Sequence, residues 1–143
     1  MIRIMTESDR GAVTEMMRIF YASPAVETNG SDEIFKSDID ECVGASPFAE
    51  GYVFTEDDTV CGYAMLAKSF STEYGRQCIW IEDIYVKPEY RSRGLGGRFF
   101  DYIKERYTDC VFRLEAEGEN ETAVRLYRKN GFTNVPYLEM WRK

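Results

Sequence analysis

A loop of seven residues, Arg91–Gly97 with the sequence RSRGLGG, has the residue types and spacing to bind an anion. Gly94, Gly96 and Gly97 allow a ligand to approach the backbone without interference from a Cβ atom. Their amides join the unpaired N–H donors at the start of the helix predicted next, and such donors favour phosphate. Three arginines add positive charge for more than one phosphate group: Arg91, Arg93 and Arg98. The loop therefore favours a diphosphate.

Other interpretations of this loop are weaker or less specific. A flexible glycine loop with solvated arginines is the alternative that the loop alone leaves open. A dinucleotide-binding motif fits less well, because Phe99 stands where GxGxxG requires its third glycine and because the loop follows the middle strands. The phosphate-binding sequence GxxxxGK[ST] occurs nowhere in the chain.

Two adjacent carboxylates, Glu82 and Asp83, interrupt the apolar run CIWIEDIYV at residues 78–86. Adjacent residues of a strand face opposite sides of a sheet, so we expect only one of them to lie in a given cleft. Burial there would raise its pKa and make it a better base near neutral pH. The chain has no histidine, which excludes Ser-His and Cys-His nucleophiles and histidine-ligated metals. A general base must therefore be a carboxylate, a tyrosine, a cysteine or a water molecule.

The four cysteines are far apart in the sequence and lie in apolar segments: Cys42, Cys61, Cys78 and Cys110. A zinc site would use closer pairs of ligands, and a reducing compartment disfavours disulfides. We expect free, buried thiols that pack as small hydrophobic side chains, and no metal site.

The length of 143 residues suits a single domain, 1–143, with one hydrophobic core. The start MIRIMTESDR has no signal-peptide architecture, and no apolar run is long enough to cross a membrane. We therefore expect a cytoplasmic protein without a membrane partner.

The net charge of −7 is unevenly distributed along the chain. Residues 1–86 contain 16 acidic and 6 basic side chains, whereas residues 87–143 contain 9 acidic and 12 basic ones. The later part suits an anionic ligand and the earlier part a cationic one. Nucleic acid is disfavoured as the main partner, because it would require a basic face.

The pattern of apolar residues predicts mixed helices and strands. Helices are expected at about residues 7–22, 34–43, 94–107 and 121–130, and strands at 2–4, 51–55, 60–70, 78–86 and 110–117. The last residues, FTNVPYLEMWRK, are expected to form two short strands broken at Pro136. A helix lies between the strands at 79–86 and 110–116, and such a crossover makes them parallel neighbours. The fold class that follows is α+β.

Two motifs resemble those of the GCN5-related N-acetyltransferase (GNAT) family. Arg91, Gly94, Gly96 and Gly97 match its acyl-CoA-binding pattern [RQ]xxGxG[GA], which follows a strand ending in V-x-P. A second run, NxxAxxLYxxxGF, is matched by Asn120, Ala123, Leu126, Tyr127, Gly131 and Phe132. The resemblance covers residues 79–133 closely and the rest only in the order of elements.

The resemblance implies a fold and a cosubstrate. The fold would be a central mixed, mostly antiparallel sheet of six to seven strands, flanked by about four helices and splayed between the fourth and fifth strands. The cosubstrate would be acetyl-CoA, with no metal. The residues that would hold it are Ile84, Tyr85 and Val86 for the pantetheine arm, Arg91, Ser92, Arg93, Gly94, Leu95, Gly96 and Gly97 for the pyrophosphate, and Asn120 and Tyr127 beyond the fifth strand.

The resemblance also assigns catalytic roles. Tyr127 would lie near the thioester and donate a proton to the departing CoA thiolate, although without the motif it would be read as a core residue. Asn120 by itself would be a helix N-cap, and it can serve both purposes. Glu82 would take the proton of the amine, directly or through an intervening water molecule, or would bind the acceptor's ammonium. Three further residues are expected at the acceptor site: Glu27, Asp83 and Tyr137.

The function implied is transfer of an acetyl group from acetyl-CoA to a primary amine by direct attack. The acidic first part of the chain favours a small cationic acceptor such as a polyamine, an amino sugar or an amino-acid derivative. Acetylation of a protein or peptide amine stays open, and so does a non-catalytic acyl-CoA-binding sensor or interaction domain. The apolar late strands could pair between two subunits of a homodimer.

Overall fold

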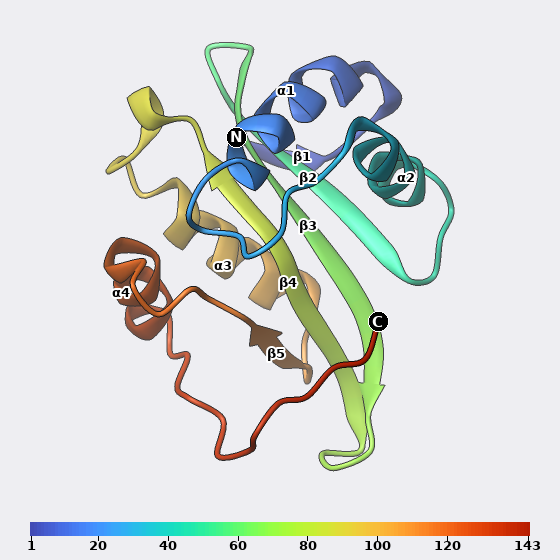
Figure 1. Cartoon of the computed structure of the whole chain (residues 1–143), viewed down its shortest axis with the longest axis vertical. Helices are drawn as coiled ribbons and strands as arrows, with labels where there is room; N and C mark the ends of the chain where they lie inside the picture. The colour runs from blue at the N-terminus through green and yellow to red at the C-terminus, as the bar shows by residue number, and fades with distance from the viewer.

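A twisted sheet of five strands runs through the computed structural model, which describes all 143 residues (Figure 1). The strands lie in the order of the chain: β1 (Ile2–Ile4), β2 (Ala49–Glu56), β3 (Thr59–Ser71), β4 (Arg76–Val86) and β5 (Val111–Leu114). Neighbours from β1 to β4 are antiparallel, whereas β4 and β5 are parallel. The predicted α+β class with a mixed, mostly antiparallel sheet is confirmed.

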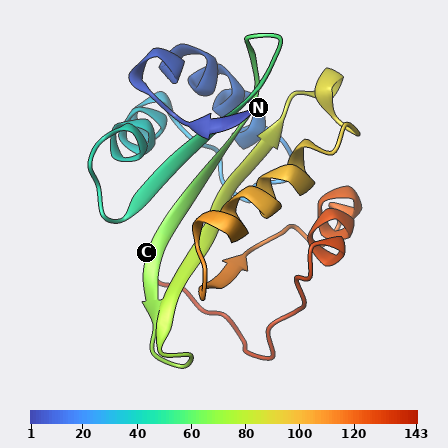
Figure 2. The same ribbon diagram turned by 180° about the vertical axis from the view of Figure 1, so that it is seen from behind.

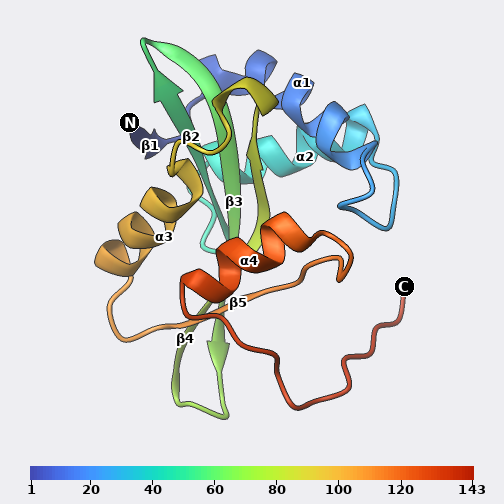
Figure 3. The ribbon, with the colours of Figure 1, turned by 90° about the vertical axis from the view of Figure 1, so that its left-hand side faces the viewer.

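Four helices cover the two faces of the sheet: α1 (Arg10–Tyr21), α2 (Asp32–Val43), α3 (Leu95–Arg106) and α4 (Glu121–Lys129). Helices α1 and α2 lie on one face and α3 on the other, as the view from behind and the side view show (Figures 2 and 3). Two short 3-10 turns precede α1 and the loop before α3, at Glu7–Asp9 and Pro88–Tyr90. None of these helices has the length and hydrophobicity needed to cross a lipid bilayer.

Two hydrophobic clusters, one on each face, fix this arrangement. On the α1 and α2 face, Val13, Met17 and Ile39 pack against strand residues such as Tyr63. On the α3 face, the apolar stripe of α3 packs against alternate residues of the central strands. Three cysteines are buried as expected, Cys110 is only half-buried, and all four thiols are free.

The expected strand count of six to seven is wrong, because residues 133–143 form no strand. All of these residues are exposed, and no backbone group among them hydrogen-bonds to another backbone group. Pro136 removes one donor and biases the chain locally, but it does not by itself prevent pairing of the residues after it. The sheet consequently ends at β5, whose outer edge is free.

Strands β4 and β5 pair only along a short stretch, Cys78–Ile81 with Val111–Leu114. Strand β4 continues to Val86, whereas β5 ends at Leu114. The second half of β4 therefore has a free edge on this side, and the two strands separate as the family resemblance implied.

A β-bulge at Glu82 marks the point of separation. Met65 of β3 is opposite Asp83 and Leu66 is opposite Ile81, so Glu82 has no partner in the ladder. The extra residue of a bulge shifts the alternation of side chains by one position. The side chains of β4 that follow Glu82 therefore point to the opposite face of the sheet from the one that strict alternation would give them.

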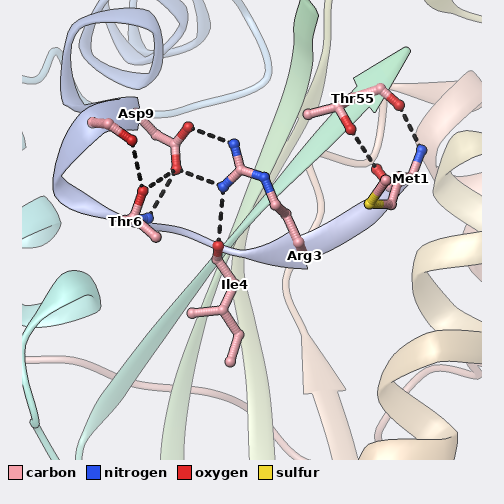
Figure 4. A network of polar contacts seen from close by, with 7 residues as sticks. Met1, Arg3, Ile4, Thr6, Asp9 and Thr55 are labelled. Atoms are coloured by element: carbon pink, nitrogen blue, oxygen red, sulfur yellow. Dashed lines mark hydrogen bonds and ion pairs between the residues drawn. The ribbon is translucent and has the colours of Figure 1, made fainter. Parts of the chain in front are cut away.

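The start of the chain is fastened by a polar network around the buried carboxylate of Asp9 (Figure 4). Both guanidinium nitrogens of Arg3 donate to Asp9 at 2.8 Å, and the Thr6 backbone N–H donates at 2.8 Å. The ion pair with Arg3 is the main reason that the pKa of Asp9 is lowered to about 2. This network joins β1 to the first turn before α1 and includes a capping box of Thr6 and Asp9 at the helix start.

Candidate active site

A cleft of about 680 Å³ opens where β4 and β5 diverge. Its walls come from the loop between α1 and α2, the second half of β4, the residues after β5, the first turns of α4 and the end of the chain. The splay of the sheet thus brings together segments that are far apart in the sequence.

Six carboxylates and no basic residue line this cleft: Glu27, Glu82, Asp83, Glu115, Glu117 and Glu139. Aromatic side chains form much of the remaining wall, among them Tyr21, Trp80 and Trp141. The charge of the lining is therefore negative, and an ammonium group is the complementary ligand.

Asp83 forms the buried floor of the cleft, with only 4% of its surface exposed. The hydroxyl groups of Tyr21 and Tyr63 each donate to one of its carboxylate oxygens at 2.9 Å. Burial raises the pKa of Asp83 to about 6, although the two tyrosine hydrogen bonds act in the opposite direction. A carboxyl group with this pKa gains or loses its proton close to neutral pH.

Glu82 lies beside Asp83 at the bulge, and its side chain is exposed. Partial desolvation raises the pKa of Glu82, and the charges of Glu115 and Asp38 raise it further. The expectation that only one of the adjacent carboxylates would lie in a given cleft is wrong, because both line this one. The extra residue of the bulge explains the difference, since it interrupts the strict alternation of a strand.

The other two expected acceptor residues have different positions. Glu27 lines the cleft, and the neighbouring carboxyl group of Glu117 raises the pKa of Glu27. Tyr137 is not part of the lining, and its hydroxyl donates to Glu73 in the turn between β3 and β4. Three later residues of the chain line the cleft instead: Glu139, Met140 and Trp141.

Tyr127 lies on α4 in the wall of the cleft, half-buried. Its ring packs edge-on against Phe100, with ring centroids 6.0 Å apart, and against Phe132 at 6.3 Å. Burial raises the pKa of Tyr127, which keeps its hydroxyl protonated at neutral pH. A protonated hydroxyl on the cleft wall can act as an acid.

Asn120 begins α4 and also lines the cleft. Its side-chain oxygen accepts the N–H of Ala123 at 3.3 Å, so it is the N-cap that its residue type predicts. At the other end of the helix, Gly131 has a φ of 91°, the left-handed conformation expected after the last turn.

The loop before α3 forms a cradle of free backbone donors. None of the six amides from Ser92 to Gly97 donates to another backbone group. Ser92 and Gly94 have φ angles of 62° and 77°, and left-handed residues of this kind occur in backbone concavities that bind anions. A Cβ atom placed on Gly97 would meet no atom within 4 Å, so the space beside it is open.

The three arginines of the loop are held by neighbouring protein groups. Arg93 donates to Glu56 at 2.9 Å, and Arg98 lies 3.6 Å from the same carboxyl group. Arg91 donates from Nε to the Val86 carbonyl at 2.8 Å, with its guanidinium over the ring of Tyr85. The arginines therefore fix the loop against β4 and β2, while the backbone amides of the loop keep no backbone partner.

The free edge of β4 adds polar groups between the cradle and the cleft. Lys87 donates to the Cys61 carbonyl on β3 at 2.9 Å. Hydrogen-bonded pairs alternate along an antiparallel ladder, so Tyr85 also bonds to β3, whereas the N–H and C=O of Ile84 and the N–H of Val86 face the open edge. The Val86 carbonyl on this edge already accepts from Arg91.

The site therefore fits an extended ligand with a diphosphate at one end. Amides without a backbone partner lie at one end, the open edge of β4 follows, and the cleft with Tyr127 lies beyond it. No cluster of three or more histidine, cysteine, aspartate or glutamate side chains has an arrangement suited to a metal ion.

Some residues of the cleft were not identified from the sequence. Glu115 and Glu117 were assigned to a strand, because their alternation with Ala116 mimics one, but β5 ends at Leu114. The sequence signal that could have identified them as cleft residues is their position directly after the end of a strand. Tyr21 and Tyr63 carry no sequence signal of their role, because only folding brings them to Asp83.

Comparison with known proteins identifies the family. Residues 13–132 match the model of the acetyltransferase (GNAT) family. The chain belongs to this family of acetyltransferases.

Individual relatives agree with this assignment. The chain is similar to the thialysine N-epsilon-acetyltransferase of Sus scrofa, with 30% identity over 99% of this chain and 88% of that protein. It shares its fold with a structure described as a possible acetyltransferase from Clostridium difficile 630 (TM-score 0.83, 20% identity, 100% of this chain and 96% of that chain). It also shares its fold with the aminoglycoside N-acetyltransferase AAC(6')-Iy in complex with CoA (TM-score 0.80, 16% identity, 100% and 93%).

Proposed function

We propose that this protein transfers the acetyl group of acetyl-CoA to a primary amine of a small cationic molecule. The observation that carries the proposal is the cleft, where a protonated Tyr127 lies on one wall and carboxylates without a basic partner line the rest. The similarity to an enzyme named for acetylating thialysine supports a small amine as the acceptor.

The proposed binding of acetyl-CoA uses the cradle and the free edge of β4. The amides of Ser92–Gly97 hold the pyrophosphate, and the backbone groups of Ile84 and the N–H of Val86 pair with the pantetheine arm. Asn120 lies beside the path of the arm into the cleft. This placement directs the thioester toward Tyr127.

The proposed reaction is a direct attack without a covalent acyl-enzyme. The amine nitrogen forms a bond to the thioester carbonyl carbon, and the carbon–sulfur bond breaks. Tyr127 donates its hydroxyl proton to the departing thiolate, which would otherwise leave as an anion in a poorly solvated cleft. The proton that the amine loses goes to a carboxylate, so charge and atoms balance.

Glu82 is the proposed acceptor of that proton, directly or through one water molecule. Its side chain is accessible in the cleft, and its raised pKa makes it a stronger base than an ordinary glutamate. Asp83, held by two tyrosines at the cleft floor, and Glu27 at the loop would attract the ammonium form of the acceptor. The carboxylate that acts as base and those that bind are thus different residues.

A panel of acceptors with matched length and different charge tests the proposed substrate class. We expect kcat/KM for a diamine to exceed that for a monoamine with a neutral hydroxyl end by about tenfold or more, and the difference to shrink as salt screens the cleft. An equally efficient reaction with neutral amines would contradict a cationic acceptor. A preference for the N-terminal amine of peptides over every small amine would instead indicate that the protein acetylates proteins or peptides.

A further inference from the structure

The carboxylate of Asp83 is held by two tyrosines that come from different elements. Tyr63 lies on β3 and is fully buried, and Tyr21 is the last residue of α1. Each hydroxyl donates to a different oxygen of Asp83 at 2.9 Å. Helix α1 and the middle of the sheet are therefore joined through one buried carboxylate at the floor of the cleft.

Packing fixes the rings of both tyrosines. The Tyr63 ring lies beside that of Tyr85, with ring centroids 6.2 Å apart, and the Tyr21 ring packs against Phe35 at 5.3 Å. A hydroxyl on a ring that is fixed in this way has few alternative positions, so the two donors determine the orientation of the carboxylate that they bind. The protein itself thus sets the orientation of Asp83.

The two hydroxyl groups also favour the charged form of Asp83. Both donate, so they stabilise the carboxylate and lower its pKa, against the effect of burial. A carboxylate oxygen can accept two hydrogen bonds, so one tyrosine per oxygen leaves capacity for a donor from the cleft.

The other titratable groups that face Asp83 supply no positive charge. Glu82 on β4 and Asp38 on α2 are acidic, and their charges raise the pKa of Asp83. Cys42 on α2 is a neutral thiol, because burial raises its pKa to about 12. A cation that neutralises Asp83 must therefore come from a ligand in the cleft.

The proposed reaction determines which ammonium group suits this carboxylate. The nitrogen that attacks acetyl-CoA must be uncharged, whereas a fixed carboxylate beside it would stabilise its ammonium form. Asp83 therefore suits a second ammonium group of the acceptor, which keeps its proton throughout, and Glu82 serves the reacting nitrogen.

On the basis of the proposed function, we infer that Tyr21 and Tyr63 are positioning residues, which hold Asp83 charged and oriented to bind the second, non-reacting ammonium group of an acceptor. They act through Asp83 and do not take part in the chemical step. Their removal should consequently weaken the recognition of charge and leave the turnover of bound acceptor nearly unaltered.

The charge preference of variants without these hydroxyl groups tests the inference. The readout is the ratio of kcat/KM for a diamine to kcat/KM for the amino alcohol of equal length, in which the protonation of Glu82 largely cancels. We expect Y21F/Y63F to lower this ratio about tenfold at pH 7, the scale of hydrogen bonds to a charged group. The change should lie in KM for the diamine, with kcat within a few-fold of wild type. Each single variant should change the ratio in the same direction by less.

The matched control is Tyr85→Phe. It removes a buried tyrosine hydroxyl from the same hydrophobic cluster, but this hydroxyl has no hydrogen-bond partner. The variant should keep the wild-type ratio for the two acceptors. A loss of charge preference in this control as large as in Y21F/Y63F would show that the effect is a general one of core tyrosines, and the inference would be wrong.

The pH dependence of the ratio separates positioning from a structural defect. In the wild type, the preference for the diamine should be lost as the pH falls through the pKa of Asp83, about 6, because the protonated group carries no charge. Without the two hydroxyl groups the pKa of Asp83 rises. Y21F/Y63F should therefore lose the preference at a higher pH than the wild type and regain it in more basic solution.

Two results would overturn the role of the tyrosines and leave the proposed function intact. They are a wild-type ratio in Y21F/Y63F over the whole pH range, and a lowered ratio that no increase in pH restores. Acetylation of the diamine by the wild type is measured in the same assay. Absence of amine-dependent thiol release from the wild type would reject the proposed function, and this inference with it.

Discussion

Tyr127 and Glu82 divide the proposed proton transfers between two environments. Burial against Phe100 and Phe132 raises the pKa of the Tyr127 hydroxyl, so it carries a proton at neutral pH. Glu82 is a carboxylate at an exposed bulge, and its pKa is raised by partial desolvation and by Glu115. One residue is consequently ready to donate a proton and the other to accept one.

Replacement of Tyr127 by Phe tests the acid. The variant Tyr127→Phe keeps the ring that packs on α3 and loses only the hydroxyl, so CoA affinity should stay within a few-fold of wild type. Turnover should fall by roughly 100-fold or more, the scale of one general acid. Calorimetric binding of CoA and the steady-state rate measure the two effects. An unchanged turnover number would remove Tyr127 from the mechanism.

Replacement of Glu82 by Gln separates a base from a binding group. As a base, Glu82 works only when deprotonated, so the wild-type rate rises with pH through its raised pKa. The variant Glu82→Gln loses this base and should need a higher pH for the same rate, because free amine then limits the reaction. A higher KM for the amine with an unaltered pH–rate profile would make Glu82 a binding residue only.

Residue types alone predicted part of this site. The glycine spacing, the carboxylates of β4 and the motif around Tyr127 were visible in the sequence. The side-by-side placement of Glu82 and Asp83 was not, because it depends on a bulge that has no sequence signature. The hydrogen bonds that Tyr21 and Tyr63 make to Asp83 join residues 62 and 20 positions apart.

At the scale of elements, the proposed CoA site combines the cradle before α3 with the free edge of β4. Amides without a backbone partner, the open backbone of Ile84 and the start of α4 follow one another along the splay. The proposed site therefore depends on the positions of these elements more than on any single side chain.

A substitution in the cradle tests this surface without damaging the fold. Gly97 lies in the first turn of α3 with open space beside its Cα, so Gly97→Ala should raise the stability to unfolding by ~0.5–1 kcal/mol. The added methyl group would occupy the space of the pyrophosphate, and the Kd for CoA should rise about tenfold or more.

The matched control is Gly11→Ala, also a helical glycine with no neighbour within 4 Å, which lies on α1. It should give a similar gain in stability and no change in CoA affinity. Thermal unfolding and calorimetry provide both measurements. Equal CoA affinity of the Gly97→Ala variant and the wild type would place the pyrophosphate elsewhere.

The polar network around Asp9 predicts that the free energy of unfolding decreases at low pH. Asp9 has a folded pKa of about 2, below its ordinary value of 3.8, so its contribution is present above pH 4 and is lost as pH falls toward 2. Asp9→Asn should lower the free energy of unfolding by about 1–2 kcal/mol at neutral pH, since Arg3 is partly exposed. Chemical denaturation at pH 7 and pH 3 checks this, and an equal loss at both pH values would contradict it.

The helices and the strands of the sheet were largely predictable from the sequence, whereas the structure of the last residues was not. Amphipathic periodicity identified all four helices, and the crossover rule identified β4 and β5 as parallel neighbours. The tail has the composition of a strand, but a strand forms only where a partner edge is available. Residues 133–143 show that a strand-like sequence does not determine which strand edge it would pair with.

At the scale of the whole molecule, the later part of the chain supplies the cradle, but the first part does not supply the acidic cleft alone. The first part contributes Glu27, Glu82 and Asp83 to the cleft, and the later part contributes Glu115, Glu117 and Glu139. In the proposed reaction, the anionic cosubstrate binds at the cradle and the cationic acceptor binds in this acidic cleft.

The most direct test of the central claim is the release of CoA thiol from acetyl-CoA in the presence of a panel of primary amines. We predict saturable, amine-dependent release with at least one small cationic amine, together with formation of the N-acetylated product. Binding of acetyl-CoA without amine-dependent thiol release from any member of a broad panel of small amines and peptides would contradict it. That result would make the protein an acyl-CoA-binding sensor.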